Sequence, residues 1–159
     1  LDDVMPENVS VLYSDPHAIE YHAVRADLVV GAVLITGARA PKLIKPAMLK
    51  KMKKGAVLVD VAIDQGGCCE TSHPTTHQNP TYEVDGVVHY CVANMPGAVS
   101  LTSSRALCNA TLPYARQLAR LGVDKFVAQS KGLASALNMR EGVIVNKAVA
   151  ETFPDLPRA

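Results

Sequence analysis

Asp64 is the first residue whose type and position suggest chemistry. It follows the apolar run Ala56–Ile63 and precedes Gln65, Gly66 and Gly67. Parallel α/β sheets bind ligands in the crevice beyond the carboxyl ends of their strands, so a carboxylate placed there should face that crevice. We therefore take Asp64 as the best single candidate for catalysis. The alternative that needs no ligand is that Asp64 caps the following loop, and the residues alone leave both interpretations open.

Two further strand ends carry small or polar residues in the same way. They are residues 33–37 (VLITG) and 93–97 (ANMPG), and each follows an apolar run. Small residues let the backbone approach a ligand closely. Three such ends in one domain predict a ligand-binding crevice.

Cysteine and histidine residues after Asp64 raise the question of a metal site, because zinc takes these ligands. They are Cys68, Cys69, His73 and His77. Adjacent cysteines do not form a zinc knuckle, and Pro74 disfavours the helical turn that would align the two histidines. We therefore predict no metal site. The remaining histidines are isolated and are interpreted as surface or core residues: His17, His22 and His89.

Short apolar runs alternate with helical segments through the first two thirds of the chain. Strands are predicted at residues 9–13, 28–35, 56–63 and 87–93, with helices at residues 16–26 and from Pro46 to Gly55. The strands lack polar alternation, and the strand at residues 28–35 in particular should be buried on both faces. This alternation predicts a parallel sheet with covered faces.

The pattern changes to helix from Thr102 onward. A long helix is predicted up to Gly122, with a bend at Pro113 inside it. Short helices are expected around residues 125–130 and 147–153, with a weak strand at residues 143–145.

Composition excludes several classes of function. The 16 basic residues nearly balance the 15 acidic ones and form no block that would follow a nucleic acid. No apolar run approaches the roughly 20 residues of a membrane helix, and no export signal opens the chain. The four cysteines are too irregularly placed for a disulfide scaffold. We expect a soluble cytoplasmic protein with reduced thiols.

The glycine fingerprint of dinucleotide-binding folds is missing. None of the ten glycines forms the G-x-G-x-x-G pattern, and no acidic residue follows at the distance expected for a ribose hydroxyl. The residues by themselves therefore predict an α/β fold holding half of a nucleotide-binding sheet.

Four segments closely resemble the alanine dehydrogenase and pyridine nucleotide transhydrogenase family, and the alanine dehydrogenases in particular. They are residues 26–44 (ADLVVGAVLITGARAPKLI), 55–82 (GAVLVDVAIDQGGCCETSHPTTHQNPTY), 86–99 (GVVHYCVANMPGAV) and 109–115 (NATLPYA). The resemblance extends over about residues 9–121 in an ordered, ungapped way.

The resemblance implies a fold and a reaction. Residues 1–96 would be the C-terminal half of an NAD(H)-binding Rossmann domain, and residues 97–159 a long helix and further helices returning to the catalytic domain. The alanine dehydrogenases of this family oxidise L-alanine reversibly with NAD to an imine, which water converts to pyruvate and ammonia. The complete family enzyme is a homo-oligomer, a hexamer.

The resemblance also implies functional residues. Asp64 matches the active-site aspartate, with a role in orienting nicotinamide, water or the amino group. Ser14 matches a serine at the adenosine end of the cofactor. The other cofactor-contacting residues implied are Val33, Leu34, Val61, Ala62, Ile63, Val92, Ala93, Asn94 and Met95.

Departures from the family bear on these expectations. His73 stands where the family has arginine, and Ser100-Leu101 stand where it has proline and arginine. The glycine fingerprint and the family's substrate-binding arginine and lysine and catalytic histidine would lie upstream of Leu1. We therefore expect the isolated chain to be inactive and to bind NAD weakly.

Two other interpretations remain open. A proton-translocating transhydrogenase has a related nucleotide-binding domain, although residues 73–82 and 109–115 fit alanine dehydrogenase better. A non-catalytic relative serving as an assembly module is the alternative outside the enzymes.

Overall fold

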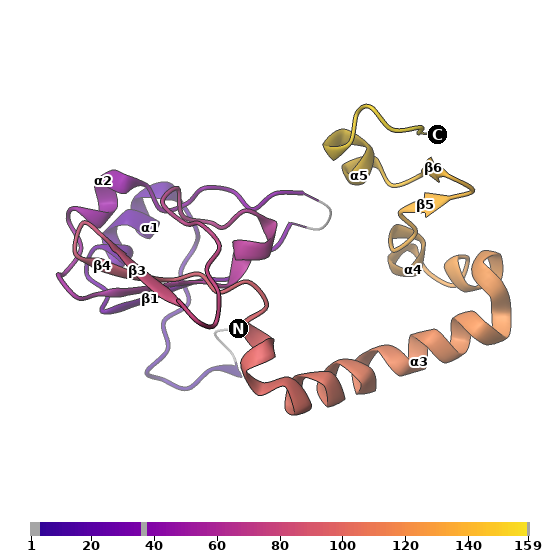
Figure 1. Ribbon diagram of the computed structural model, residues 1–159, viewed down its shortest axis with the longest axis horizontal. Helices are drawn as coiled ribbons and strands as arrows, with labels where there is room; N and C mark the ends of the chain where they lie inside the picture. Colours follow the sequence, from indigo (N-terminus) through magenta and orange to yellow (C-terminus); the bar gives the residue numbers. More distant parts are fainter. Residues whose placement is uncertain (1–3, 36–37, 159) are drawn as a thin grey trace. The chain divides into compact units, whose positions relative to one another are not determined.

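The computed structural model describes residues 4–35 and 38–158 and divides them into two compact units (Figure 1). Unit 1 contains the described residues up to Leu34 and residues 39–95, and unit 2 contains residues 35, 38 and 96–158. Thr36 and Gly37, which end the first predicted crevice segment, lie outside the described residues.

Unit 1 is built on a four-stranded sheet. The strands are β1 (Leu28–Gly31), β2 (Val57–Asp60), β3 (Thr81–Val84) and β4 (Val87–Tyr90), in the order β1-β2-β4-β3. β1 pairs with β2 and β2 with β4 in parallel, whereas β3 pairs with β4 antiparallel. The predicted side-by-side parallel arrangement of the three apolar runs is confirmed, and the protein has a mixed α/β fold. The hairpin strand β3 was not predicted.

Two helices cover one face of this sheet. Helix α1 (Pro16–Ala23) begins at Asp15, whose carboxylate accepts hydrogen bonds from the backbone amides of His17 and Ala18. Pro16 occupies the first turn, where its missing N–H costs nothing. The short helix α2 (Pro46–Leu49) also begins with a proline. The core cluster joins both helices to the sheet through Ala23, Ile44, Met48, Leu49, Met52, Ala56, Leu58, Cys69 and Val87.

The opposite face of β1 is open, which contradicts the predicted burial on both faces. Leu28 is 57% exposed and Val30 is 56% exposed, whereas Val29 packs against the core. The reason is that α1 and α2 contribute to the core on the Val29 side alone. The register places Val57 beside Leu28 and Val59 beside Val30, and these two side chains of β2 are half-buried.

The predicted strand at residues 9–13 is wrong. This segment is extended but pairs with no strand among the described residues, and Tyr13 is 94% exposed. A strand needs a hydrogen-bonding neighbour. As the second half of a doubly wound sheet, residues 9–13 would be its third strand and β1 its fourth, and the third strand pairs with the second, not with the fourth. None of the described residues supplies such a second strand.

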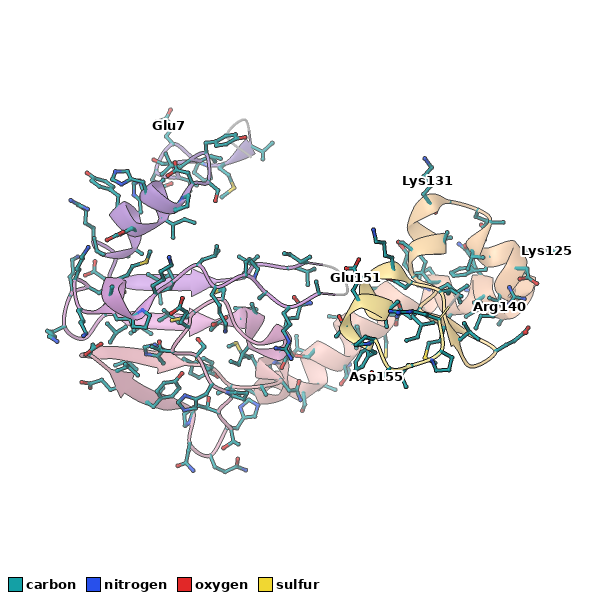
Figure 2. All side chains as sticks on the ribbon, turned by 90° about the horizontal axis from the view of Figure 1, so that it is seen from above. Glu7, Lys125, Lys131, Arg140, Glu151 and Asp155 are labelled. Carbon is teal, nitrogen blue, oxygen red and sulfur yellow. The ribbon has the colours of Figure 1, made fainter. Side chains whose placement is uncertain are left out.

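Unit 2 is mainly helical. A 3-10 turn η3 (Met95–Val99) leads into α3 (Ser100–Val127), followed by α4 (Lys131–Ser135) and α5 (Lys147–Thr152). The two-residue strands β5 (Met139–Arg140) and β6 (Val143–Ile144) form an antiparallel pair, in agreement with the weak strand predicted there. Charged side chains such as Lys131 point away from the ribbon (Figure 2).

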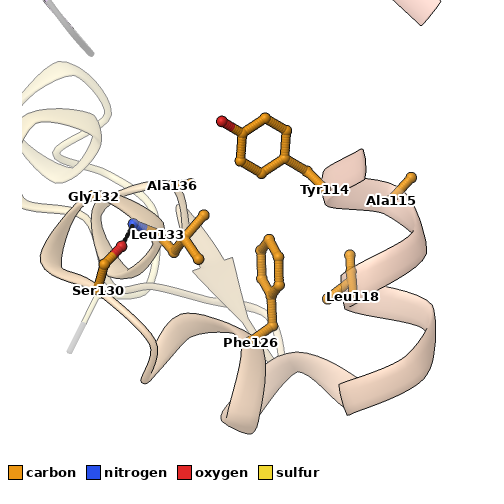
Figure 3. A pocket seen from close by; sticks show the side chains of 8 residues that line it. All are labelled: Tyr114, Ala115, Leu118, Phe126, Ser130, Gly132, Leu133 and Ala136. Carbon is orange, nitrogen blue, oxygen red and sulfur yellow. Dashed lines mark hydrogen bonds between the residues drawn. The ribbon is translucent and has the colours of Figure 1, made fainter. Parts of the chain in front are cut away.

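Helix α3 is interrupted at Gly122, the residue at which the long helix was predicted to end. Gly122 has φ 72° and ψ 168°, and it is the one residue of α3 with non-helical angles, whereas Pro113 lies within the helix. Residues of α3 on both sides of this break, together with residues in and next to α4, line an apolar hollow of about 640 Å³ (Figure 3). Figure 3 shows Tyr114, Phe126 and Leu133 pointing toward it. No helix in the described parts of the chain is both long and apolar enough to span a membrane.

Candidate active site at the carboxyl ends of the parallel strands

Asp64 lies on a 3-10 turn that follows strand β2. The strand ends at Asp60, three residues earlier than predicted, and the turn η2 (Val61–Gln65) carries Asp64. The prediction that Asp64 directly ends the strand is therefore wrong. The turn reverses the chain at the strand end and leaves Asp64 exposed while Ala62 and Ile63 are buried.

Five of the predicted site residues line one hollow. Its volume is about 310 Å³, and its lining consists of Ala32, Val33, Leu34, Val61, Ala62, Asp64 and Gln65. The hollow thus joins the segment after β1 to the turn after β2, as expected for neighbouring parallel strands. Its walls are aliphatic, and Asp64 is the one ionisable group among the lining residues.

Other predicted residues lie elsewhere in unit 1. The side chains of Ile63 and Val92 are 4% and 0% exposed, so they pack into the interior and do not line the hollow. Asn94 is exposed with a left-handed φ of 58°, and its carbonyl oxygen lies 3.1 Å from the Nε2 atom of His77. Since a carbonyl can only accept, Nε2 of His77 carries the hydrogen in this contact. Ala93 is exposed and Met95 is half-buried.

Ser14 lies at a second hollow of about 570 Å³. This hollow lies between the start of α1 and residues 42–48, and its lining includes Asp15, His17, Lys42 and Lys45. Ser14 is therefore separate from the hollow that contains Asp64.

Asp60 is a buried carboxylate that the sequence analysis missed. It is 0% exposed, and its oxygens accept hydrogen bonds from the backbone amides of Cys68 and Cys69 and from the hydroxyl of Ser72. The burial of Asp60 could have been predicted from the sequence, because a residue two positions after Leu58 in a strand points to the same, buried face. A charged group is buried only where donors satisfy it.

The two cysteines after Asp64, Cys68 and Cys69, are buried in the interior of unit 1. Cys69 lies 3.0 Å from the hydroxyl of Thr71, which lies 2.8 Å from Nε2 of the buried His89. Burial and the neighbouring carboxylate of Asp60 raise the pKa of the Cys68 thiol to about 12, which keeps it neutral and unreactive. No group of three potential metal ligands occurs among the residues that the structure describes.

His73, the departure from the family pattern, stacks on an aromatic ring. Its ring centroid lies 3.8 Å from that of Tyr82, and Tyr82 in turn stacks on His89 at 4.9 Å. The phenol of Tyr82 donates to the carbonyl of Thr71 and accepts from the amide of His73. Burial, followed by the Cys91 thiol, raises the pKa of Tyr82 above its usual range.

Comparison with known proteins decides the family. Residues 1–147 match the family described as alanine dehydrogenase/PNT, C-terminal domain. The chain belongs to the alanine dehydrogenase/PNT family. It is 56% identical over 153 residues to an alanine dehydrogenase of Halomonas elongata, and 51% identical over 154 residues to alanine dehydrogenase 2 of Staphylococcus aureus. These matches cover 96% of the chain and 41% of each relative, so the chain spans about two fifths of their length.

Solved structures of the family agree with this assignment. An L-alanine dehydrogenase superposes with a TM-score of 0.77 at 49% identity, covering 97% of this chain and 42% of that one. A transhydrogenase of Sinorhizobium meliloti gives a TM-score of 0.59 at 25% identity and covers 72% of this chain and 32% of that one. Within the alanine dehydrogenase/PNT family, the chain is therefore more similar to the alanine dehydrogenase branch than to the transhydrogenase.

Proposed function

We propose that this chain forms the nicotinamide side of the cofactor site in an NAD-dependent alanine dehydrogenase, which interconverts L-alanine with pyruvate and ammonia. The observation that supports the proposal is the hollow in which Asp64 meets Val33, Leu34, Val61 and Ala62. The relatives at 51% identity and above carry the name alanine dehydrogenase.

The residues of the hollow fit the nicotinamide end of NAD. Aliphatic walls suit a flat ring, and a single carboxylate can orient a polar group on one side of it. A volume of about 310 Å³ is too small for a whole dinucleotide, and the chain has no glycine fingerprint to hold the pyrophosphate. NAD, when bound, supplies a ring that exchanges a hydride with the α-carbon of the substrate.

The proposed task of Asp64 is orientation. An ionised carboxylate only accepts hydrogen bonds, so Asp64 would hold the amino group of alanine, or the water that attacks the imine, by an N–H or O–H donor. The side chains of Val33, Leu34 and Val61 would exclude further water from the reacting atoms. Holding both reactants at near-attack distance is a large part of such catalysis.

Further parts of the proposal concern residues outside the hollow. Ser14 would contact the adenosine end of NAD, and residues 93–95 would complete the wall beyond β4. Residues 1–96 would act as the second half of a Rossmann domain and residues 97–159 as the return to the catalytic domain. The enzyme would be a cytoplasmic homo-oligomer, a hexamer as in the family.

A chimeric enzyme tests the proposal. This chain replaces the matching 153 residues of the Halomonas elongata alanine dehydrogenase, and NADH formation from L-alanine is followed by absorbance. We expect turnover, and we expect Asp64→Asn to lower kcat by about 100-fold or more with a small change in the affinity for NAD. Glu83→Gln, which neutralises an exposed acid on β3, is the matched control.

Two outcomes would contradict the proposal. A folded chimera that binds NAD but does not oxidise alanine would favour a non-catalytic assembly module. Unchanged turnover in Asp64→Asn would remove Asp64 from the active site. In calorimetric titration, the 159-residue chain by itself is expected to bind NAD weakly and to show no turnover, since the pyrophosphate cradle is missing from its sequence.

A further inference from the structure

The backbone that follows Asp64 is bound by a lysine on its carbonyl side. The ammonium of Lys42 donates to the carbonyl oxygens of Gly66 at 2.5 Å, Gly67 at 2.9 Å and Cys69 at 3.1 Å. An ammonium has three donors, so these three bonds use all of them. Lys42 also borders the hollow that contains Ser14, but with its donors engaged it is not available to an anion there.

The same backbone is bound by Asp60 on its amide side. Oδ2 of Asp60 lies 2.9 Å from the amide nitrogen of Cys68, 3.2 Å from that of Cys69 and 2.6 Å from the hydroxyl of Ser72. The approach is close enough to require glycine at residue 67, since a Cβ there would lie 2.7 Å from Oδ2 and φ is 74°.

Lys42 and Asp60 hold the same peptide units from opposite sides. The peptide joining Gly67 to Cys68 presents its carbonyl to Lys42 and its N–H to Asp60. The next peptide presents its N–H to Asp60 and its carbonyl, that of Cys68, to the amides of Leu43 and Ile44. Bonds to charged groups are roughly twice as strong as neutral ones. Two successive peptides directly after the Asp64 turn are thereby fixed in orientation.

We propose that Lys42 and Asp60 are positioning residues for Asp64, acting as a clamp on residues 66–69. This inference rests on the proposed function, in which Asp64 orients the reacting groups. The turn η2 ends at Gln65 and is capped by Gly66, so the clamp begins at the residue that caps the turn. Releasing the clamp would let the carboxylate of Asp64 shift, and a shift of about 1 Å can lower a rate by about 100-fold.

Hydrogen exchange on the 159-residue chain tests the clamp without activity. In Lys42→Met we expect the amides of Cys68 and Cys69 to exchange at least about 10-fold faster, with β1 and β2 unchanged, because the loss is local. Asp60→Asn tests the other side of the clamp in the same way. Ser72→Ala, which should give a smaller effect of the same kind, replaces Asp60→Asn if that variant does not fold. Lys51→Met is the matched control, since Lys51 pairs with Glu20. Unchanged exchange at residues 66–69 in Lys42→Met would overturn the inference.

Kinetics of the chimera test the positioning role. We expect Lys42→Met to lower kcat about 10- to 100-fold while KM for NAD changes less than about twofold, and Lys42→Arg to restore part of kcat. A raised KM for NAD with unchanged kcat would show that Lys42 binds the cofactor instead, and would overturn the positioning role. An inactive parent chimera would contradict the proposed function, while the exchange experiment would still decide whether the clamp exists.

Discussion

Unit 1 and unit 2 bury their apolar side chains to very different extents. In the described parts of the chain, most buried apolar side chains belong to unit 1, and unit 2 contributes Phe126 and Ile144. Helix α3 in unit 2 instead exposes large apolar side chains: Leu101, Leu107, Leu112, Tyr114, Leu118 and Val123. Burial of apolar surface is the main term that offsets the entropy cost of folding. Unit 1 thus has the internal core needed to hold a site in fixed geometry, and unit 2 has little.

The largest expected difference between the units comes from removing a leucine. Leu49→Ala empties a fully buried site in unit 1 and should lower its free energy of unfolding by about 2–5 kcal/mol. Leu107→Ala, at a side chain that is 65% exposed in unit 2, should change stability by less than about 0.5 kcal/mol. Hydrogen exchange resolved by unit measures both variants. A comparable loss in Leu107→Ala would show that α3 has a packed partner, and the contrast between the units would fail.

The second largest expected difference between the units is in how their stability depends on alkaline pH. The pKa of Cys68 is raised from 9.0 to about 12, so the folded form of unit 1 holds that proton more tightly than the unfolded form. The resulting stability is complete below about pH 9 and is lost as the pH rises toward about 12. In unit 2, Asp124 has a lowered pKa and Arg140 a raised one, and their pair stays charged over this range.

Methyl NMR during urea unfolding checks this pH dependence. The signals of Leu58 report on unit 1 and those of Leu133 on unit 2. We expect the unfolding midpoint of unit 1 to fall between about pH 9 and about pH 12, and Cys68→Ala to flatten that fall. An equal fall for Leu133 would mean that the effect is not specific to unit 1.

A backbone substitution in unit 2 should have a smaller, local effect. Gly122→Ala places a Cβ in open space, so any effect arises from φ 72° and ψ 168°, which side chains disfavour by about 1–3 kcal/mol. We expect faster amide exchange on both sides of the break. Gly132→Ala is the matched control, because it lies in α4 without a positive φ. Equal exchange in both variants would show that the break at Gly122 is not populated.

The sequence predicted the parallel strands better than the details of the site. Runs of β-branched residues located β1, β2 and β4, because burial in a sheet favours them. The strand β3 was missed, although Asp85-Gly86 is a two-residue turn typical of a hairpin. The break at Gly122 agrees with the predicted end of the long helix, although α3 resumes there and continues to Val127.

The residues that line the site could be predicted from the sequence, but the contacts that hold its backbone could not. Asp64 was identified from its position after an apolar run, its neighbours were identified by similarity to a family, and five of these residues do line one hollow. The partners of Asp60 and Lys42 are backbone groups of residues 66–69, and backbone groups leave no trace in the residue types. Such contacts depend on the path of the loop, which only the folded chain defines.

The smallest expected effects come from the helix caps. Losing a cap should cost the same free energy in both units, but the length of helix that opens should differ. Asp15 caps α1 and Ser130 caps α4, and replacing either by alanine should cost about 1 kcal/mol. Helix α1 packs on the core through Ile19 and Ala23, so Asp15→Ala should fray only its first turn. Helix α4 has five residues and none of them is fully buried, so Ser130→Ala should open the whole helix.

Exchange of the Ala134 amide, which donates to the backbone carbonyl of Ser130 and keeps that acceptor in Ser130→Ala, measures the opening of α4. Ser135→Ala is the matched control, because its hydroxyl bonds a carbonyl inside the helix and caps nothing at the start. If α4 stays as protected in Ser130→Ala as in Ser135→Ala, packing around the hollow of Figure 3 holds it. Unit 2 would then have a core of its own despite its few buried side chains, because such protection requires buried contacts that resist local opening.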